Sequence, residues 1–276
     1  MASGLLAEDN TLTYKLIALD LDGTLLPFFG AISARTKQVI RSAMDAGIVV
    51  VLASGRPFPS MQPYVEELAI SAPVIANQGC QIVLPDTLQV VYDVAIPFAP
   101  ARLLLDYLQP RAIDVIVDIH DNVYVRASRL SEEFFDSFVG RRYHPTDDLN
   151  GIMNEEPVKV LMIDEKEGHE RLLPELQERF GDQIHFIRAH PMFIEAIPLG
   201  VSKATALEQV AGNLGISQEQ TIAIGDADND IEMVAWAGLG VAMGNASSGV
   251  RAVADHIALS VDEDGAAVAI EAFCLG

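Results

Sequence analysis

An apolar run that ends in two carboxylates, Leu16 to Thr24, most constrains the fold of this chain. Its first part, Leu16 to Leu19, is the short aliphatic stretch typical of a strand buried on both faces. Asp20 and Asp22 follow two residues apart, so on an extended backbone both side chains point the same way. Gly23 then permits a sharp turn. Because ligands bind beyond the carboxyl ends of strands in parallel α/β sheets, the segment predicts a ligand site at a strand end.

Taken alone, this pair of carboxylates leaves two interpretations open. Carboxylates held close together repel each other, and either a divalent cation relieves the repulsion or one carboxyl holds a proton and serves as an acid. An acidic turn without any chemical role has the same appearance in a sequence. Only the rest of the chain distinguishes a site from such a turn.

The alternation of apolar run, polar turn and helix continues downstream. Ser33 is placed to cap a helix that Gly47 ends, and the next aliphatic run leads into Ser54-Gly55-Arg56. A further helix and a short strand then lead to Asn77-Gln78-Gly79. This order of elements predicts a doubly wound parallel sheet. The expected strands are 48–53 and 73–76, and the expected further helix is 60–68.

The middle of the chain has a different pattern. Two successive segments each contain a strand, a helix and a hairpin, which predicts an α+β module with an antiparallel sheet, and the polar stretch 141–156 is expected to be a loop. We therefore expect a doubly wound core, residues 1–82 and 196–276, interrupted by an inserted α/β cap domain, residues 83–195. The expected cap strands are 88–96, 115–120, 123–127, 158–164, 184–189 and 192–197, and the expected cap helices are 99–108, 131–139 and 166–180.

After Pro198 the parallel pattern returns. Ser202 is placed to cap a helix, and Lys203 follows it directly. A lysine at a helix start opposes the helix dipole unless it faces an anion or carboxylates. A buried strand, 221–224, then leads into Gly225-Asp226-Ala227-Asp228-Asn229-Asp230, which places oxygen-bearing side chains at another strand end. Mg²⁺ prefers such hard oxygen ligands, although Asp and Asn are also common at helix N-termini.

Together, four of these segments resemble the motifs of the haloacid dehalogenase superfamily of phosphotransferases. The resemblance covers nearly the whole chain, and the Ser-Gly-Arg form with a large insertion is similar to the Cof-type branch (class IIB, with a C2-type cap). It implies a Rossmann-like core with a C2B-type cap. In one departure, Gln78 stands where the pattern has Asn before the glycine. The motifs in order are Asp20-Leu21-Asp22-Gly23-Thr24-Leu25, Ser54, Lys203 in Gly200-Val201-Ser202-Lys203, and Gly225-Asp226-x-x-Asn229-Asp230.

The resemblance implies a magnesium-dependent phosphatase that acts on phosphate monoesters of small metabolites, such as sugar phosphates. Asp20 would attack phosphorus and form an aspartyl-phosphate, and Asp22 would act first as the acid and then as the base. Dehalogenase-type members lack this second acid, so ester hydrolysis is favoured. The resemblance assigns Mg²⁺ to Asp20, the backbone carbonyl of Asp22 and Asp226, with Asp230 beside Lys203 or a metal-bound water. It assigns phosphate contacts to Thr24, Ser54, Gly55, Lys203 and Asn229.

Two other functions share these features. A phosphomutase with the same core and cap would retain and return the phosphoryl group, and the sequence does not exclude it. A non-catalytic protein that binds metal and phosphate is disfavoured, since the expected nucleophile, acid, lysine and metal ligand are all present. Cap cations that could read the substrate's leaving group are Arg126, Arg129, Arg141, His144, Arg188 and His190.

Composition limits the partners. The 276-residue chain carries a formal net charge of −21, which argues against nucleic acids and anionic membranes and requires any phosphate site to be locally positive. Cys80 and Cys274 are far apart in sequence, which does not suggest a disulfide framework. The N-terminus lacks a signal-peptide pattern, and no apolar run is long enough to span a bilayer. We therefore expect a cytoplasmic protein. The expected partner is a small phosphorylated metabolite. The sequence leaves monomer or dimer open.

Overall fold

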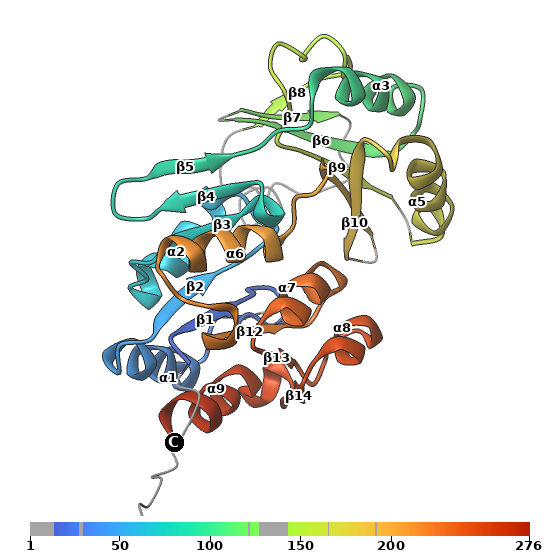
Figure 1. The fold of residues 1–276 in the computed structure, drawn as a ribbon. Coiled ribbons are helices and arrows are strands. Elements are labelled where there is room, and N and C mark those ends of the chain that lie inside the picture. Colours follow the sequence, from blue (N-terminus) through green and yellow to red (C-terminus); the bar gives the residue numbers. More distant parts are fainter. Residues whose placement is uncertain (1–13, 28–29, 121, 127–142, 165, 191) are drawn as a thin grey trace, which may run out of the picture.

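The computed structural model describes residues 14–27, 30–120, 122–126, 143–164, 166–190 and 192–276. Within these residues, five parallel strands form the core sheet in the order β14-β13-β12-β1-β2 (Figure 1). Strand β1 pairs with both β2 and β12, so the ends of two strands about two hundred residues apart in sequence lie side by side. The strands are β1 (Leu16–Leu19), β2 (Val49–Leu52), β12 (Thr221–Gly225), β13 (Leu239–Ala242) and β14 (His256–Ile257).

Helices cover both faces of the core sheet. The strands are apolar throughout, and alternate side chains enter opposite faces: Ile17 and Leu19 pack in one hydrophobic cluster, and Leu16 and Ala18 in another. The first cluster receives α1 (Ala34–Asp45), α2 (Phe58–Leu68), α8 (Ser248–Val253) and α9 (Gly265–Ile270), and the second receives α6 (Lys203–Asn213) and α7 (Ile231–Trp236). This arrangement confirms the predicted doubly wound core.

A mixed sheet inserted between β5 and α6 forms the cap above the core in Figure 1. Its order, as far as the structure describes the chain, is β10-β11-β9-β6-β7-β8, and α3 (Phe98–Leu108) and α5 (Lys166–Phe180) pack on one face. The predicted class, a doubly wound core with an inserted α+β cap, is therefore confirmed. The domain limits at 82/83 and 195/196 stay a prediction. The cap strands are β6 (Asp114–Ile119), β7 (Asn122–Arg126), β8 (Tyr143–Pro145), β9 (Lys159–Ile163), β10 (Ile184–His190) and β11 (Phe193–Pro198).

Two local predictions were wrong. The strand expected over 88–96 is shorter and belongs to a small antiparallel sheet of β3 (Val74–Ala76), β4 (Gln81–Leu84) and β5 (Gln89–Asp93), of which β4 was not predicted. The stretch 141–156, expected to be a loop, contains β8, an edge strand whose Tyr-His-Pro sequence has little strand character. The helix expected over 131–139 lies outside the described residues.

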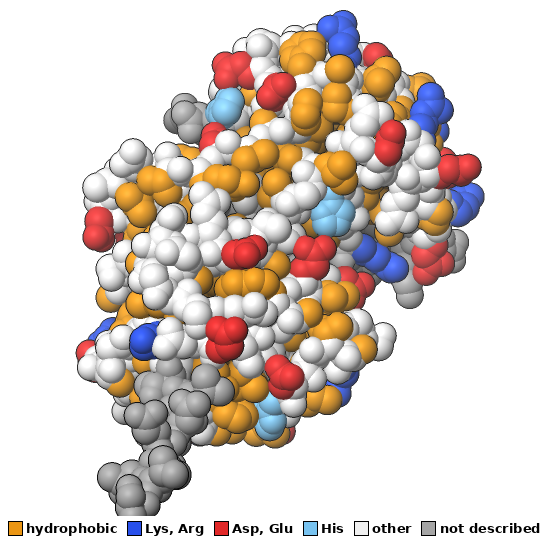
Figure 2. Space-filling model, in the orientation of Figure 1, with side chains coloured by type: hydrophobic (Ala, Val, Ile, Leu, Met, Phe, Trp, Pro, Cys, Tyr) orange, Lys and Arg blue, Asp and Glu red, His pale blue; other side chains and the backbone are white. Residues whose placement is uncertain are grey.

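The surface reflects the acidic composition. Figure 2 shows carboxylate side chains scattered over the visible face of both core and cap rather than gathered in one patch. Among the described residues, no helix is both long and apolar enough to cross a membrane.

Candidate active site

The parallel pairing of β1 with β12 brings the first and fourth sequence motifs together. Asp20 directly follows β1, and its backbone N–H donates to the carbonyl of Ile224 at 3.1 Å, next to the end of β12. In the described part of the chain, carboxylate oxygens of Asp20, Asp226 and Asp230 lie within 4.8 Å of one another. The predicted strand-end site is thus a compact cluster of carboxylates.

Lys203 enters this cluster from the start of α6. Its Nζ donates to Oδ1 of Asp20 and to Oδ1 of Asp230, each at 2.6 Å, and the side chain is 0% exposed. Burial alone would lower the pKa of Lys203, but the nearby Asp20 and Asp230 outweigh it and raise the pKa above its ordinary value. The lysine is therefore charged, and its unfavourable position at a helix start is explained by the carboxylates that it faces.

Hydrogen bonds fix the orientation of Asp226. Thr24 Oγ1 donates to its Oδ1 at 3.1 Å, and Asn245 Nδ2 donates to its Oδ2 at 3.2 Å and to the Gly23 carbonyl at 2.9 Å. Gly23 has a φ of +87°, and a Cβ there would lie 2.2 Å from Asp226 Oδ2, so glycine is needed at this turn. Asn245 was not singled out in the sequence, although its place just beyond β13, at another strand end, was a usable signal.

Burial and mutual repulsion favour protons or a cation in this cluster. Burial, followed by the charge of Asp230, raises the pKa of Asp226 to about 7, and the same two causes raise the pKa of Asp20 well above its usual range. Asp230 Oδ2 also accepts from the backbone N–H groups of Asp226 and Ala227, at 2.9 and 3.1 Å. The carboxylates of the cluster can carry more negative charge than the single positive charge of Lys203 offsets. Hard oxygen donors of this kind suit a divalent metal ion such as Mg²⁺.

Metal-free protein should lose stability as the pH rises through the titration of Asp226. The pKa of Asp226 is raised from 3.8 to about 7, so between these values the native state binds more protons than the unfolded state and the free energy of unfolding falls with rising pH. A bound cation replaces the proton, so added Mg²⁺ should raise the melting temperature more at about pH 8 than at about pH 5. Thermal unfolding of chelator-treated protein checks this, and Asp226→Asn should flatten the dependence. An identical pH dependence in wild type and Asp226→Asn would contradict it.

Arg56, in the segment after β2, forms an ion pair with Asp22, the second carboxylate of the first motif. Arg56 donates to both oxygens of Asp22, from Nε at 2.8 Å and from Nη2 at 2.6 Å. Burial lowers the pKa of Arg56, but the hydrogen bond to Asp22 and the nearby negative charges, that of Asp22 first, together outweigh it, so the pKa is raised overall. The Asp22 side chain is 47% exposed, whereas Ser54 is buried and its Oγ accepts from the Arg56 N–H at 3.2 Å. Arg56 was quoted in the sequence motif without a role, and the structure gives it this partner.

The remaining predicted phosphate residues meet around Gln78. Asn229 Nδ2 donates to Gln78 Oε1 at 2.9 Å. A Cβ on Gly55 would lie 2.2 Å from Gln78 Nε2, so the Gln78 amide packs directly on the Gly55 backbone. The structure thus gathers the predicted nucleophile, acid, lysine and metal carboxylates at one edge of the sheet. The phosphate contacts of Thr24, Ser54, Gly55 and Asn229 stay predictions.

The cap cations have mixed outcomes. Arg126 is buried and donates to the carbonyls of four residues inside the cap, so its proposed role in reading the leaving group is replaced by one in holding cap backbone. The exposed His144 ring lies 5.4 Å from the Tyr124 ring, and Arg188 is half-buried on β10. Arg129, Arg141 and the side chain of His190 lie outside what the structure describes.

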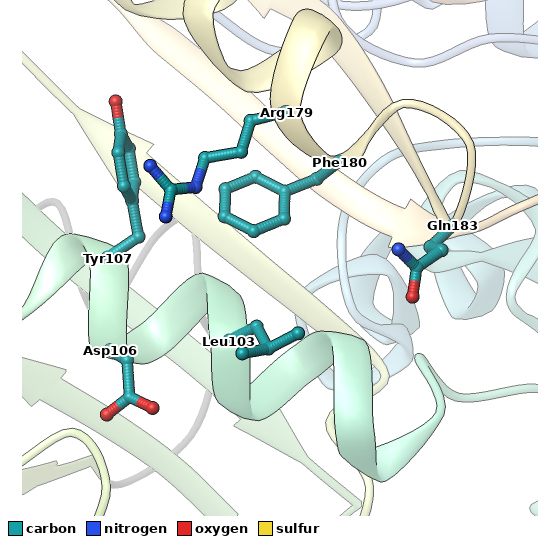
Figure 3. Close-up of a pocket in the computed structure, with 6 residues that line it drawn as sticks. All are labelled: Leu103, Asp106, Tyr107, Arg179, Phe180 and Gln183. Carbon is teal, nitrogen blue, oxygen red and sulfur yellow. The ribbon is translucent and has the colours of Figure 1, made fainter.

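A groove of about 330 Å³ lies on the outer side of the cap, between α3 and α5. Figure 3 shows Tyr107, Phe180 and the guanidinium of Arg179 gathered there. None of the predicted site residues lines it, so this groove is separate from the carboxylate cluster.

Comparison with known proteins matches nearly the whole chain. The family described as haloacid dehalogenase-like hydrolase matches residues 17–270. The 5-amino-6-(5-phospho-D-ribitylamino)uracil phosphatase YitU of Bacillus subtilis is 32% identical over 257 residues, covering 91% of this chain and 94% of YitU. A haloacid dehalogenase-like hydrolase from Bacteroides thetaiotaomicron is 31% identical, with a TM-score of 0.82 over 94% of this chain and 99% of that one. A subclass IIB sugar phosphatase shares the fold at 24% identity, with a TM-score of 0.83 over 94% and 98% of the two chains.

Carboxylates at adjacent strand ends, a lysine that reaches them from a helix start, and an inserted α+β cap are the arrangement of a capped phosphoryl-transfer hydrolase. The chain belongs to the haloacid dehalogenase-like hydrolase family, and its core and cap share the fold of the subclass IIB sugar phosphatase. It is a phosphatase, a hydrolase of phosphoric monoesters, as the sequence motifs predicted.

Proposed function

We propose that this phosphatase requires Mg²⁺ and hydrolyses phosphate monoesters of small metabolites through a phosphorylated Asp20. The observation that carries the proposal is the position of Lys203, whose Nζ lies 2.6 Å from both Asp20 and Asp230 inside the carboxylate cluster. The charge of Lys203 does not fully neutralise the three carboxylates, so the cluster can also bind a divalent cation. The lysine and the cation together would attract the negatively charged phosphoryl group.

Asp20 is the nucleophile in this proposal. Its carboxylate attacks phosphorus in line, so a bond from Asp20 oxygen to phosphorus forms as the bond to the leaving oxygen breaks. Burial raises the pKa of Asp20, but the charge of Lys203 acts in the opposite direction and supports the reactive carboxylate. Mg²⁺ held by Asp20, the backbone carbonyl of Asp22 and Asp226 would neutralise charge on the carboxylates and on the phosphoryl oxygens.

Asp22 moves the proton. It donates a proton to the leaving oxygen and then accepts one from the water that attacks the phosphorylated Asp20. Arg56 donates to both oxygens of Asp22 and so holds this side chain in a fixed orientation. The acid step requires a protonated Asp22 released from Arg56, and the 47% exposure of the Asp22 side chain leaves room for that movement.

Small neutral groups complete the phosphate site. The hydroxyls of Thr24 and Ser54, the Gly55 backbone and the Asn229 amide contact the phosphoryl oxygens in this proposal, beside the charge of Lys203. Ser54 and Thr24 are buried, so their hydrogen bonds would act in a medium where they are stronger than in water. Stabilisation of the transferring group is mainly an electrostatic task, which such fixed dipoles perform.

The substrate class comes from the relatives. YitU, similar over nearly its whole length, is a phosphatase of a compound that carries a phosphorylated ribityl chain. We infer that this chain also acts on a small phosphorylated metabolite, with sugar and sugar-alcohol phosphates as the first class to test. The cap lies above the core in Figure 1, and Lys159 of the cap donates to the Gly55 carbonyl in the segment after β2, so in this proposal the cap contacts the leaving group.

Phosphate release from a panel of phosphorylated sugars, sugar alcohols and an aryl phosphate tests the proposal. We expect release in Mg²⁺, loss of release in excess chelator and recovery when Mg²⁺ is added back. The ester with the highest kcat/KM identifies the preferred leaving group. Two outcomes would overturn the proposal: no release from any ester in the presence of Mg²⁺, or conversion of an ester into an isomer without release, which is the behaviour of a mutase.

A further inference from the structure

Buried polar side chains form a continuous connection between cap and core beside the active site. Lys159 on β9 and Glu195 on β11 come from the cap, and Gln78 comes from the core; each is at most 2% exposed. Gln78 Nε2 donates to Glu195 Oε2 at 2.9 Å, and Glu195 Oε1 lies 3.5 Å from Lys159 Nζ. Lys159 Nζ also donates to the carbonyl of Gly55 at 2.7 Å. The connection therefore starts and ends in the core.

The Gln78 loop is held in a strained conformation. Asn77 and Gln78 have φ values of +49° and +61°, which are unfavourable for residues other than glycine. The backbone N–H of Gln78 donates to the Ser54 carbonyl at 3.1 Å, and a Cβ on Gly79 would lie 2.2 Å from the Ser202 carbonyl. The loop is thus wedged between the segments that carry Ser54 and Lys203. The extra methylene of Gln78, relative to the Asn of the family pattern, lets its amide bridge Glu195 and Asn229.

Glu195 determines the direction of these hydrogen bonds. As the ion-pair partner of Lys159 it is a carboxylate, which accepts hydrogen bonds and cannot donate them. Gln78 must therefore turn Nε2 toward Glu195 and Oε1 toward Asn229. Asn229 must in turn present Nδ2 to Gln78, and its buried Oδ1 has no hydrogen-bond partner among the described residues. A charge in the cap thereby orients an amide in the core.

We propose that Gln78 is a positioning residue: its amide, oriented by Glu195, accepts from one N–H of Asn229 Nδ2 and so directs the other N–H of Nδ2 toward a phosphoryl oxygen. The inference rests on the proposed function in that it takes Asn229 to contact phosphate. Gln78 acts through Asn229 and not on the substrate. Its effect on the reaction must therefore disappear when the Asn229 amide is absent.

A double-mutant cycle tests this dependence. Gln78→Leu keeps a comparable side-chain volume but removes both hydrogen bonds, and Asn229→Ala removes the target amide. We expect Gln78→Leu to lower kcat/KM and the affinity for inorganic phosphate in Mg²⁺ by about tenfold or more, the usual cost of losing a supporting partner. In the Asn229→Ala background the same change should have little further effect. Losses that simply multiply would overturn the proposal, since a purely structural role predicts them.

A gentler variant keeps the test valid if Gln78→Leu folds poorly. Gln78→Asn shortens the side chain but keeps its amide, so it should show a smaller loss that also vanishes without the Asn229 amide. Exposed Gln89 on β5 supplies the matched control, because Gln89→Asn should leave kcat/KM and phosphate affinity unchanged.

The phosphate-binding readout separates this proposal from the proposed function, because it needs no turnover. If wild-type protein hydrolyses esters but the losses caused by Gln78→Leu and Asn229→Ala multiply, only the role of Gln78 is overturned. Wild-type protein that binds phosphate without hydrolysing any ester overturns the proposed function and leaves the cycle measurable. Wild-type protein that does neither overturns both.

Discussion

Asp20→Asn is expected to abolish phosphate release, with a loss of kcat of about 10³-fold or more, because an amide cannot replace the carboxylate as nucleophile. The substitution preserves shape, so the loss should not come from unfolding. Burial of Asp20, followed by the like charges of Asp230 and Asp226, raises its pKa, which makes its ionised form costly in metal-free protein. Removing the charge should therefore raise the melting temperature of metal-free protein at neutral pH.

Asp20→Asn is thus expected to lower activity and to raise the melting temperature of metal-free protein. Activity on an aryl phosphate, melting temperature with chelator and Mg²⁺ affinity by titration calorimetry should be measured on the same preparation. We expect lower activity, a higher melting temperature and weaker Mg²⁺ binding. Asp45→Asn, at an exposed position on α1, is the matched control and should change none of the three. Activity within about tenfold of wild type would exclude Asp20 as the nucleophile.

The sequence predicted the parts of the site that are local in the chain. Asp20 and Asp226 each directly follow a buried aliphatic run, and Lys203 follows a capping serine, so pattern alone assigned them to strand ends and a helix start. The resemblance to the family motifs implied that they meet, which agrees with the rule that the carboxyl ends of parallel strands share one edge of a sheet. The pairing of β1 with β12, which the sequence did not predict, brings the first and fourth motifs together.

The parts that sequence missed depend on contacts between distant segments. Nothing local to Arg56 shows that it faces Asp22, and the bond between Gln78 and Glu195 spans 117 residues and the cap–core boundary. Arg126 shows the converse: a cation in the cap looked available for substrate, but its guanidinium donates to backbone carbonyls at the end of α3 and in the segment after it. Charge type is visible in a sequence, whereas the partner that uses the charge is fixed by packing.

Lys203→Met is expected to reduce kcat by about 10²-fold or more and to destabilise metal-free protein by about 3–5 kcal/mol, the usual cost of leaving buried charges without their partner. The side chain is 0% exposed and its Nζ lies 2.6 Å from Asp20 and Asp230, so its loss leaves both carboxylates facing each other. Without the lysine the pKa of Asp20 should rise further, because the charge of Lys203 is what lowers it. The remaining activity should therefore need a higher pH than that of wild type.

A second substitution separates folding from catalysis. Adding Asp230→Asn to Lys203→Met removes one of the two carboxylate charges that repel each other once the lysine is absent. We therefore expect the melting temperature to recover substantially while kcat stays low. Lys37→Met is the matched control: Lys37 pairs with Glu67 at 2.8 Å on the surface, and its loss should cost less than about 1 kcal/mol with no change in kcat. Recovery of kcat together with stability in the double variant would show that Lys203 only balances charge. A loss of kcat in a stable double variant that exceeds the loss in Asp230→Asn alone assigns Lys203 to the reaction itself, because relative to Asp230→Asn the double variant lacks only the cation that faces the nucleophile and the phosphoryl group.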